Sequence, residues 1–360
     1  MKRSFCSLLI LLSLPLLLLG AISSAQDQPE ILPSPYYFPE DIAYFPKSPE
    51  FKLAREAAAM KAYRDEQEAS LVSKEDSASG NKLVADSLAM LGKQRTVSAK
   101  LRIKTMAYGH ELVGTGEYQQ MGLGASPMLR LEMKIPIANK MTSKLQVSNG
   151  KIMWTRTEIE EGEPQVSRVD LERIREQVEK QKVTPHIDPA INWMMFGGLS
   201  RLLAGLSSNF EFGEARADVL QEEPVWIVTG VWKPEALAKV ATHLKNDVLA
   251  KKPDVLAKLP PHLPVAVTLV LDRGEKGANF PYRIEYLHLA DGKATLGPDS
   301  TTPYLVMELY EVDFEADLNA KMFDFRPTDA ESVVEQTELY LKDLLPEKPA
   351  TAQETSRRVK

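Results

Sequence analysis

Cysteine is almost absent from this sequence: Cys6 is the single one among 360 residues. Cys6 stands before the first apolar run and not at the end of that run, where a bacterial lipid-attachment cysteine would be. Cleavage of the N-terminal segment would leave a mature chain with no cysteine. The composition therefore excludes a disulfide framework and a lipid anchor of this kind.

Histidine is also scarce, and the motifs of common enzymes are missing. None of the five histidines has a second histidine or a cysteine at a short ligand spacing, so we expect no metal site and no cofactor. The sequence contains no G-x-S-x-G or H-E-x-x-H motif, and "GTG" at 114–116 lacks the third glycine of a dinucleotide fingerprint. We therefore expect no enzyme. A hydrolase with a triad assembled from distant residues is the weakest of three alternatives. The histidines are His110, His186, His243, His262 and His288.

Basic charge is not in excess either. The chain carries 44 Lys and Arg residues against 50 Asp and Glu residues, a formal net charge of −6. Proteins that bind nucleic acid present basic surfaces, so nucleic acid is not expected as a partner.

Long apolar runs are missing after the N-terminus. Lys2 and Arg3 precede a Leu/Ile-rich run at residues 8–19, and the small residues Ser23 and Ala25 follow it. This is the layout of a signal peptide over residues 1–25, cleaved after Ala25, and it predicts a periplasmic or secreted protein. The alternative is an uncleaved N-terminal anchor. No second run of about 18 apolar residues follows that could span a membrane.

Prolines and aromatic residues are concentrated at 26–49. Proline at six positions between 29 and 49 favours an extended backbone, so residues 26–49 are expected to form a tether. The aromatic residues of 29–49 either pack onto the domain surface or dock an envelope protein. Residues 50–80 read as a helix rich in Ala, Glu, Lys and Arg, followed by a polar linker.

From residue 96 onward the hydrophobic period is two. Val97, Ala99, Leu101 and Ile103 alternate with polar residues, and "MLRLEMKIPI" at 128–137 repeats the pattern. "SNGK" at 148–151 is typical of an Asn-Gly hairpin turn. Further alternating segments follow at short intervals, which favours antiparallel pairing. The number of strands predicts an α+β, mainly β, fold with a strongly curved antiparallel sheet that forms an incomplete barrel.

Several helices are expected around this sheet. One covers about 81–92, a second is capped by Asp170, and a C-terminal helix begins near Thr328 because Thr328 and Glu331 have capping-box spacing. One curved-sheet domain is assigned to residues 81–345, followed by a disordered tail at 346–360.

The segment at 189–207 is the least polar part of the chain after the N-terminus. Met195, Leu199, Leu202, Leu203 and Leu206 fall on one helical stripe, and Gly197 and Gly198 interrupt it. The pattern predicts two short helical pieces with a hinge at the two glycines. The segment is either a helix that closes the core or a lid over an apolar cavity that can withdraw for a ligand.

The order of these patterns resembles that of the outer-membrane lipoprotein carrier (LolA-like) superfamily. The resemblance covers about residues 81–327. It rests on the helix "LVADSLAML" leading into "TVSAKLRIKT", then "GEYQQ", "MLRLEMKI" and "KLQVSNGKIMWT", an apolar helical insertion, "EEPVWIVTGVWK", and a strand series ending in "FDFRP". It implies an incomplete barrel whose helices cover a concave apolar face. It also implies a lid-anchoring arginine, for which Arg102, Arg130 and Arg156 are the choices.

The leading hypothesis is an exported, non-enzymatic carrier with a lidded apolar cavity. The resemblance implies a lipid, an acyl chain or a lipoprotein as its ligand. The second hypothesis is an envelope protein-interaction or sensor module of the same fold with a filled core. The residues expected to bind the apolar ligand are Trp154, Trp193, Met194, Met195, Phe196, Leu199, Leu202, Leu203, Leu206 and Trp226.

Overall fold

The computed structural model describes residues 77–344 apart from 108–109, 125, 138–139, 182–196, 275–278, 298 and 330. The chain divides into two units, Met1–Leu71 and Val72–Lys360, and all the described residues belong to the second. The predicted signal peptide, tether, helix at 50–70 and tail at 346–360 lie outside the described residues.

The described residues form one sheet of 14 strands. Its order is β1-β9-β10-β11-β12-β13-β2-β3-β4-β5-β6-β7-β14, with β8 paired to β10. In chain order the strands are β1 (Ser77–Ser79), β2 (Thr96–Ala107), β3 (His110–Met121), β4 (Met128–Ile137), β5 (Lys140–Ser148), β6 (Ile152–Ile159), β7 (Gln165–Asp170), β8 (Phe210–Phe212), β9 (Glu214–Leu220), β10 (Glu223–Trp232), β11 (Ala266–Asp272), β12 (Pro281–Leu289), β13 (Thr301–Asp313) and β14 (Val333–Glu335).

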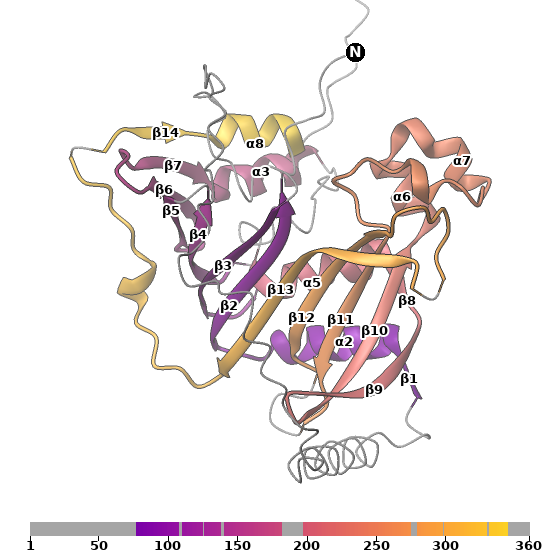
Figure 1. The fold of residues 1–360 in the computed structure, drawn as a ribbon. Helices are drawn as coiled ribbons and strands as arrows, with labels where there is room; N and C mark the ends of the chain where they lie inside the picture. Colours follow the sequence, from indigo (N-terminus) through magenta and orange to yellow (C-terminus); the bar gives the residue numbers. More distant parts are fainter. Residues whose placement is uncertain are drawn as a thin grey trace, which may run out of the picture. The chain divides into compact units, whose positions relative to one another are not determined.

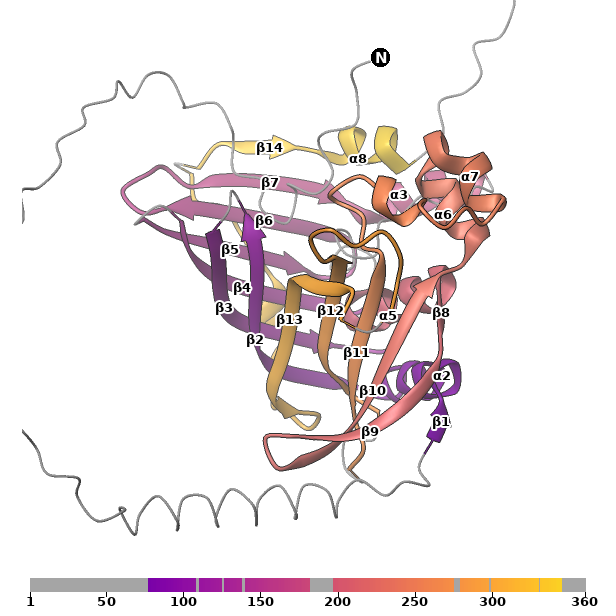
Figure 2. The same cartoon turned by 45° about the vertical axis from the view of Figure 1, so that its right-hand side comes forward.

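The sheet is strongly curved and remains open, as Figures 1 and 2 show. Its two edge strands, β1 and β14, do not pair with each other. Neighbouring strands pair antiparallel, except that β14 lies parallel to β7. The predicted fold class, a mainly β protein with an incomplete antiparallel barrel, is confirmed.

The hairpin predicted at 148–151 joins β5 to β6. The side-chain oxygen of Asn149 accepts hydrogen bonds from the backbone N–H groups of Lys151 and Ile152, and Gly150 has φ +86°. A positive φ is the conformation that glycine adopts without strain, so the Asn-Gly pair fixes the turn. This turn sets the register of β5 against β6.

Two helices, α2 (Gly80–Leu91) and α5 (Gly198–Asn209), pack on the concave face of the sheet. Their leucines and valines join strand residues of β2–β4 and β8–β13 in one large hydrophobic cluster. A smaller cluster lies where α3 (Leu171–Gln181) meets α8 (Thr337–Leu344) and β6–β7. A third cluster lies within the insertion that follows β10. This insertion contains α6 (Pro234–Val240), η2 (Thr242–Leu244), α7 (Lys245–Leu249) and η3 (Leu256–Lys258).

The helices at 80–91 and after Asp170 form as predicted. The backbone N–H of Arg173 donates to Asp170 Oδ1 at 2.9 Å, which caps α3. No helix among the described residues is long and apolar enough to cross a membrane.

The C-terminal helix begins later than predicted. The capping-box contact exists, since the backbone N–H of Thr328 donates to Glu331 Oε2 at 2.9 Å. The chain then extends as β14 along β7, and α8 starts only at Thr337. β-Branched Val333 and Val334 favour the strand, and sheet pairing overrides the local helix signal. We call residues 314–332, which cross from β13 to β14 and contain η4 (Ala320–Phe323), the strap.

Candidate functional site

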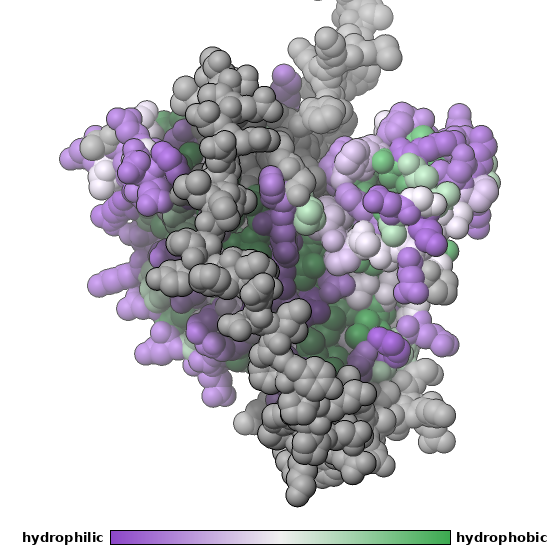
Figure 3. All heavy atoms as spheres, in the orientation of Figure 1, coloured by the Kyte–Doolittle hydropathy of each residue, from purple (hydrophilic) through white to green (hydrophobic). Residues whose placement is uncertain are grey.

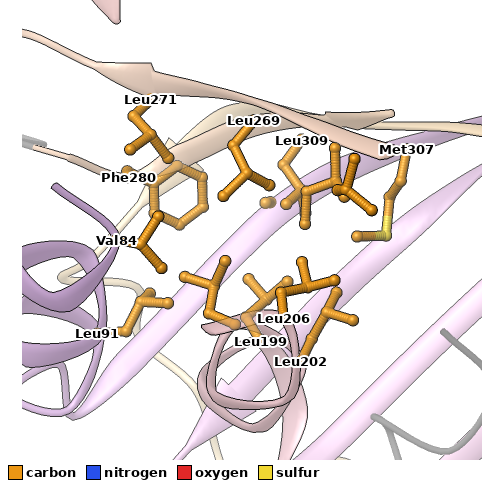
Figure 4. Packing of buried hydrophobic residues seen from close by; sticks show 14 of the residues in the cluster. Val84, Leu91, Leu199, Leu202, Leu206, Leu269, Leu271, Phe280, Met307 and Leu309 are labelled. Carbon is orange, nitrogen blue, oxygen red and sulfur yellow. The ribbon is translucent and has the colours of Figure 1, made fainter. Parts of the chain in front are cut away.

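The leucine stripe of α5 is fully buried. Leu199, Leu203 and Leu206 expose 0% of their surface, and Leu202 exposes 1%. These residues lie at i, i+3, i+4 and i+7, so one face of the helix carries all four. Figure 4 shows Leu199, Leu202 and Leu206 on the side of α5 that faces the sheet, opposite Leu269, Leu309 and Met307. α5 therefore occupies the concave apolar face, as expected from its pattern.

The two glycines mark the start of this helix. Gly197 has φ +124° and Gly198 has φ +66°, so the chain turns sharply before entering α5. A Cβ atom on Gly198 would lie 2.3 Å from the hydroxyl of Tyr118 and 2.9 Å from Leu129 Cδ2. The helix begins where the break was predicted. The first helical piece, with Trp193, Met194, Met195 and Phe196, lies outside the described residues.

A buried tyrosine holds the beginning of α5. The hydroxyl of Tyr118, in β3, accepts a hydrogen bond from the backbone N–H of Leu199 at 3.2 Å and donates one to Gln120 Oε1 at 2.6 Å. Burial raises the pKa of Tyr118 above its ordinary value, so the hydroxyl keeps its proton. The first N–H groups of a helix have no partner within it, and Tyr118 satisfies one of them from a distant strand.

The described contacts of the arginines considered as lid anchors lie in other parts of the fold. Arg102 pairs across strands, and Arg130 and Arg156 contact the strap. Their described partners include Glu308 at 3.4 Å, the carbonyl of Met322 at 3.4 Å and Glu331 at 2.8 Å. None of these partners belongs to α5. Among the described residues, the side-chain hydrogen bond to the start of α5 comes from Tyr118.

The structure places Trp154 and Trp226, two residues expected to bind the ligand, on opposite faces of the sheet. Trp154 pairs with Val147 and lies opposite Arg168, so it points to the convex face. Its ring packs against Phe325 of the strap, with centroids 5.7 Å apart. β6 therefore presents Trp154 to the strap and not to the α5 leucines.

Trp226 lies on the same face as the α5 leucines. It pairs with Leu271 and packs against the large cluster, while the guanidinium of Arg273 lies 4.6 Å from its ring centroid. Such stacking of a cation on an aromatic face is favourable. Trp226 is thus partly buried against the leucine cluster, and a role in ligand binding stays a prediction.

The concave face changes character from one half of the sheet to the other. Strand register aligns Leu309, Leu101, Gly116 and Met133 in one row across β13, β2, β3 and β4. The same row continues with Lys144 of β5 and Thr157 of β6. Directly paired residues of an antiparallel sheet point to one face. In Figure 3 apolar residues gather over the middle of the molecule and hydrophilic residues surround them.

Sequence reasoning missed both Tyr118 and Lys144. A period-two pattern in β5 does not by itself tell which of its two faces meets the core. The register places Leu145 and Val147 on the convex face, next to Glu132 and Arg130 of β4. The strap covers part of this face, and a covering segment distant in sequence is invisible to a local pattern.

No family model matches this sequence, and no curated protein matches it. Three solved structures to which it is similar are a DUF1329 family protein from Desulfovibrio piger, a LolA superfamily protein from Nitrosomonas europaea and the lipoprotein LppX from Mycobacterium tuberculosis. Their sequence identities are 9%, 12% and 11%, with TM-scores of 0.30, 0.25 and 0.26. The similarity covers 68%, 69% and 67% of this chain and 95%, 98% and 100% of theirs. The superfamily that the sequence pattern resembles is thus represented among the similar solved structures.

Proposed function

We propose that this protein is an exported, non-enzymatic carrier that binds one acyl chain or lipid on the concave face of its sheet, with α5 as the lid. The observation that carries the proposal is the seating of α5. Four fully buried leucines fill the apolar face, while the helix starts at two glycines in left-handed backbone. A segment with this hinge can leave as a unit, and the surface that it uncovers is apolar.

The energies of lid and ligand are of similar size. Each fully buried leucine contributes roughly 1.5–3 kcal/mol, so four contribute about 6–12 kcal/mol. An acyl chain gains about 0.8 kcal/mol for each buried CH₂. About 8–15 methylene groups therefore offset the loss of the α5 contacts. A chain of ordinary membrane-lipid length fits this range.

A second candidate is an envelope protein-interaction module with a permanently filled core. The burial of the same four leucines favours it, because a helix with 0–1% exposure is also what a core helix shows. The two candidates differ in one respect. A lid competes with a ligand for the apolar face, whereas a core helix does not.

The distinguishing experiment replaces Leu203 with alanine and titrates the protein with a fluorescent fatty acid. Loss of the buried side chain should cost about 2–5 kcal/mol of stability. If α5 is a lid, much of this loss destabilises the closed state relative to the open one, and the affinity for the probe rises about tenfold or more. The titration is made below the unfolding transition, because partly unfolded proteins also bind apolar dyes.

The matched control is Leu237→Ala in α6. Leu237 is also buried, at 3% exposure, but it belongs to the separate cluster of the insertion. The Leu237→Ala variant should lose stability without any gain in probe affinity. Saturable binding of about one probe per chain, tighter only in Leu203→Ala, supports the carrier. Absence of saturable binding in the parent and in both variants contradicts it and favours the interaction module.

A further inference from the structure

The insertion after β10 carries positive charge in an acidic protein. Residues 233–265 contain six lysines and no arginine against three acidic residues, a net charge of +3 in a chain whose net charge is −6. Its helices α6 and α7 lie beyond the end of β10, as both ribbon views show (Figures 1 and 2). The insertion therefore presents a cationic surface at one end of the sheet.

Most of these lysines are exposed, and several have no acidic partner. Lys233 is half-buried and donates to the carbonyl of Ser207 at 2.7 Å. Two of the five exposed lysines pair with aspartates of the insertion, each at 2.7 Å. The other three form no ion pair with the residues that the structure describes, and they are Lys239, Lys245 and Lys251.

An exposed leucine lies among these lysines. Leu249 ends α7 and exposes 50% of its surface, because the insertion's own hydrophobic cluster takes in Leu244 and Val248 and leaves Leu249 outside. Lys245 precedes Leu249 by four residues, so the two lie on one side of the helix. Lys251 follows in a turn, where its backbone N–H donates to the carbonyl of Val248 at 3.0 Å. An apolar side chain and two cations without acidic partners therefore lie close together at the surface.

We propose that Lys245 and residues 249–254, the tip of the insertion, dock on the surface of an anionic phospholipid bilayer. Leu249 enters the boundary between headgroups and acyl chains, and the lysines lie beside the phosphates. Lysine suits this place because its apolar stem can follow the leucine while its ammonium group stays in water. Each lysine near an anionic bilayer strengthens binding about fivefold. This inference does not depend on α5 acting as a lid.

The size of the tip favours a bilayer over a protein partner. All six residues of 249–254 are exposed. A stable protein interface buries about 800 Å² on each partner and uses about 20–30 residues a side, which is more than this tip provides. A bilayer needs no matching shape, and apolar insertion together with basic charge is what holds proteins at its surface.

Docking by the tip also places one end of α5 near the bilayer. The backbone N–H of Lys233 donates to the carbonyl of Asn209 at 2.9 Å, and the ring of Trp232 packs on Phe210 with centroids 4.2 Å apart. Both contacts join the insertion to the C-terminal end of α5, opposite the end that Tyr118 holds. A lipid that leaves the concave face at this end would meet the bilayer directly.

The experiment measures co-sedimentation of the exported protein with vesicles of phosphatidylcholine alone or mixed with an equal part of phosphatidylglycerol. One test variant combines Lys245→Gln with Lys251→Gln, which removes charge and keeps a polar side chain. A second test variant is Leu249→Ala. The matched controls alter exposed residues outside the insertion: Lys93→Gln combined with Lys293→Gln, and Leu339→Ala, whose leucine exposes 56%.

A fluorescent label reports whether Leu249 itself enters the lipid. Cys6 is the only natural cysteine and lies in the predicted signal peptide, so Leu249→Cys supplies a single site for a nitrobenzoxadiazole label. Leu339→Cys is the labelled control. A label that enters the bilayer emits more strongly and at shorter wavelength.

We expect the parent to bind the phosphatidylglycerol vesicles at least tenfold more tightly than phosphatidylcholine vesicles, and added salt to weaken this binding. The double lysine variant should bind at least tenfold more weakly, Leu249→Ala several-fold more weakly, and both controls as the parent does. Only the label at position 249 should respond to vesicles. No preference for phosphatidylglycerol, parent-like binding by the double lysine variant, or a silent label at 249 overturns the inference. Binding to polyglutamate without binding to vesicles also overturns it and assigns the surface to an acidic protein.

Discussion

Removal of the Tyr118 hydroxyl tests how the lid is held. In Tyr118→Phe the ring and its packing remain, but the backbone N–H of Leu199 and the side-chain oxygen of Gln120 each lose a hydrogen bond. Both partners are buried, and water does not replace the hydroxyl while α5 stays closed. The closed state is therefore weakened selectively.

The structure gives the size of the effect. A buried donor or acceptor left without a partner costs about 1–3 kcal/mol. The Leu199 N–H regains a partner in water once α5 opens, so this part of the cost falls on the closed state alone. An opening equilibrium shifted by 1–3 kcal/mol raises the affinity for an apolar probe by about 5-fold to 150-fold.

The assay combines urea unfolding with titration of N-phenyl-1-naphthylamine below the unfolding transition. Tyr282→Phe is the control, because the ring of Tyr282 also packs at the edge of the large cluster and contacts Phe280. Tyr118→Phe should lose stability and bind the probe more tightly, while Tyr282→Phe should bind it as the parent does. A loss of stability in Tyr118→Phe with unchanged probe affinity refutes the role of this hydroxyl as a latch.

Three further predictions follow from single residues. The pKa of Lys144 is lowered from 10.5 to about 8, so the unfolded parent binds more protons between these values. The parent should therefore gain stability as pH rises from 8 to 10.5. Urea unfolding at pH 7 and pH 10.5 should show this gain in the parent and a smaller gain in Lys144→Met. Gly198→Ala should cost at least 1–2 kcal/mol in thermal unfolding, because φ is +66° and the new Cβ meets Tyr118. At Gly213, with no atom closer than 3.9 Å, alanine should be tolerated. N-terminal sequencing of the exported protein should show cleavage after Ala25, and a membrane-bound chain that keeps its first residue would contradict export as a soluble protein.

The parts of this fold that sequence patterns predict are those set by local chemistry. The leucine stripe of α5 is predicted by its 3.6-residue period. The β5–β6 hairpin is predicted by Asn149–Gly150, because an Asn-Gly pair favours a tight turn. The break before α5 follows from Gly197–Gly198. Each of these signals lies within a few residues of the structure that it dictates.

The parts that local patterns miss depend on residues far apart in the chain. Tyr118 and Leu199 are 81 residues apart, and only the folded sheet brings them together. Trp154 is large and apolar, yet the register turns it to the convex face, where Phe325 of the strap packs against its ring. Lys144 reads as an ordinary polar residue of an alternating strand until the register aligns it with Met133.

Hydrogen exchange of the α5 amides tests the central claim, that α5 leaves the concave face when a ligand binds. The amides of Leu199–Leu206 and those of β3 and β4 are compared in the free protein and with saturating tetradecanoate. A displaced lid exchanges faster in the complex, while the strands that the ligand covers exchange more slowly or at the same rate. Saturable binding with α5 exchange unchanged or slowed would show that the helix stays in the core and would contradict the account.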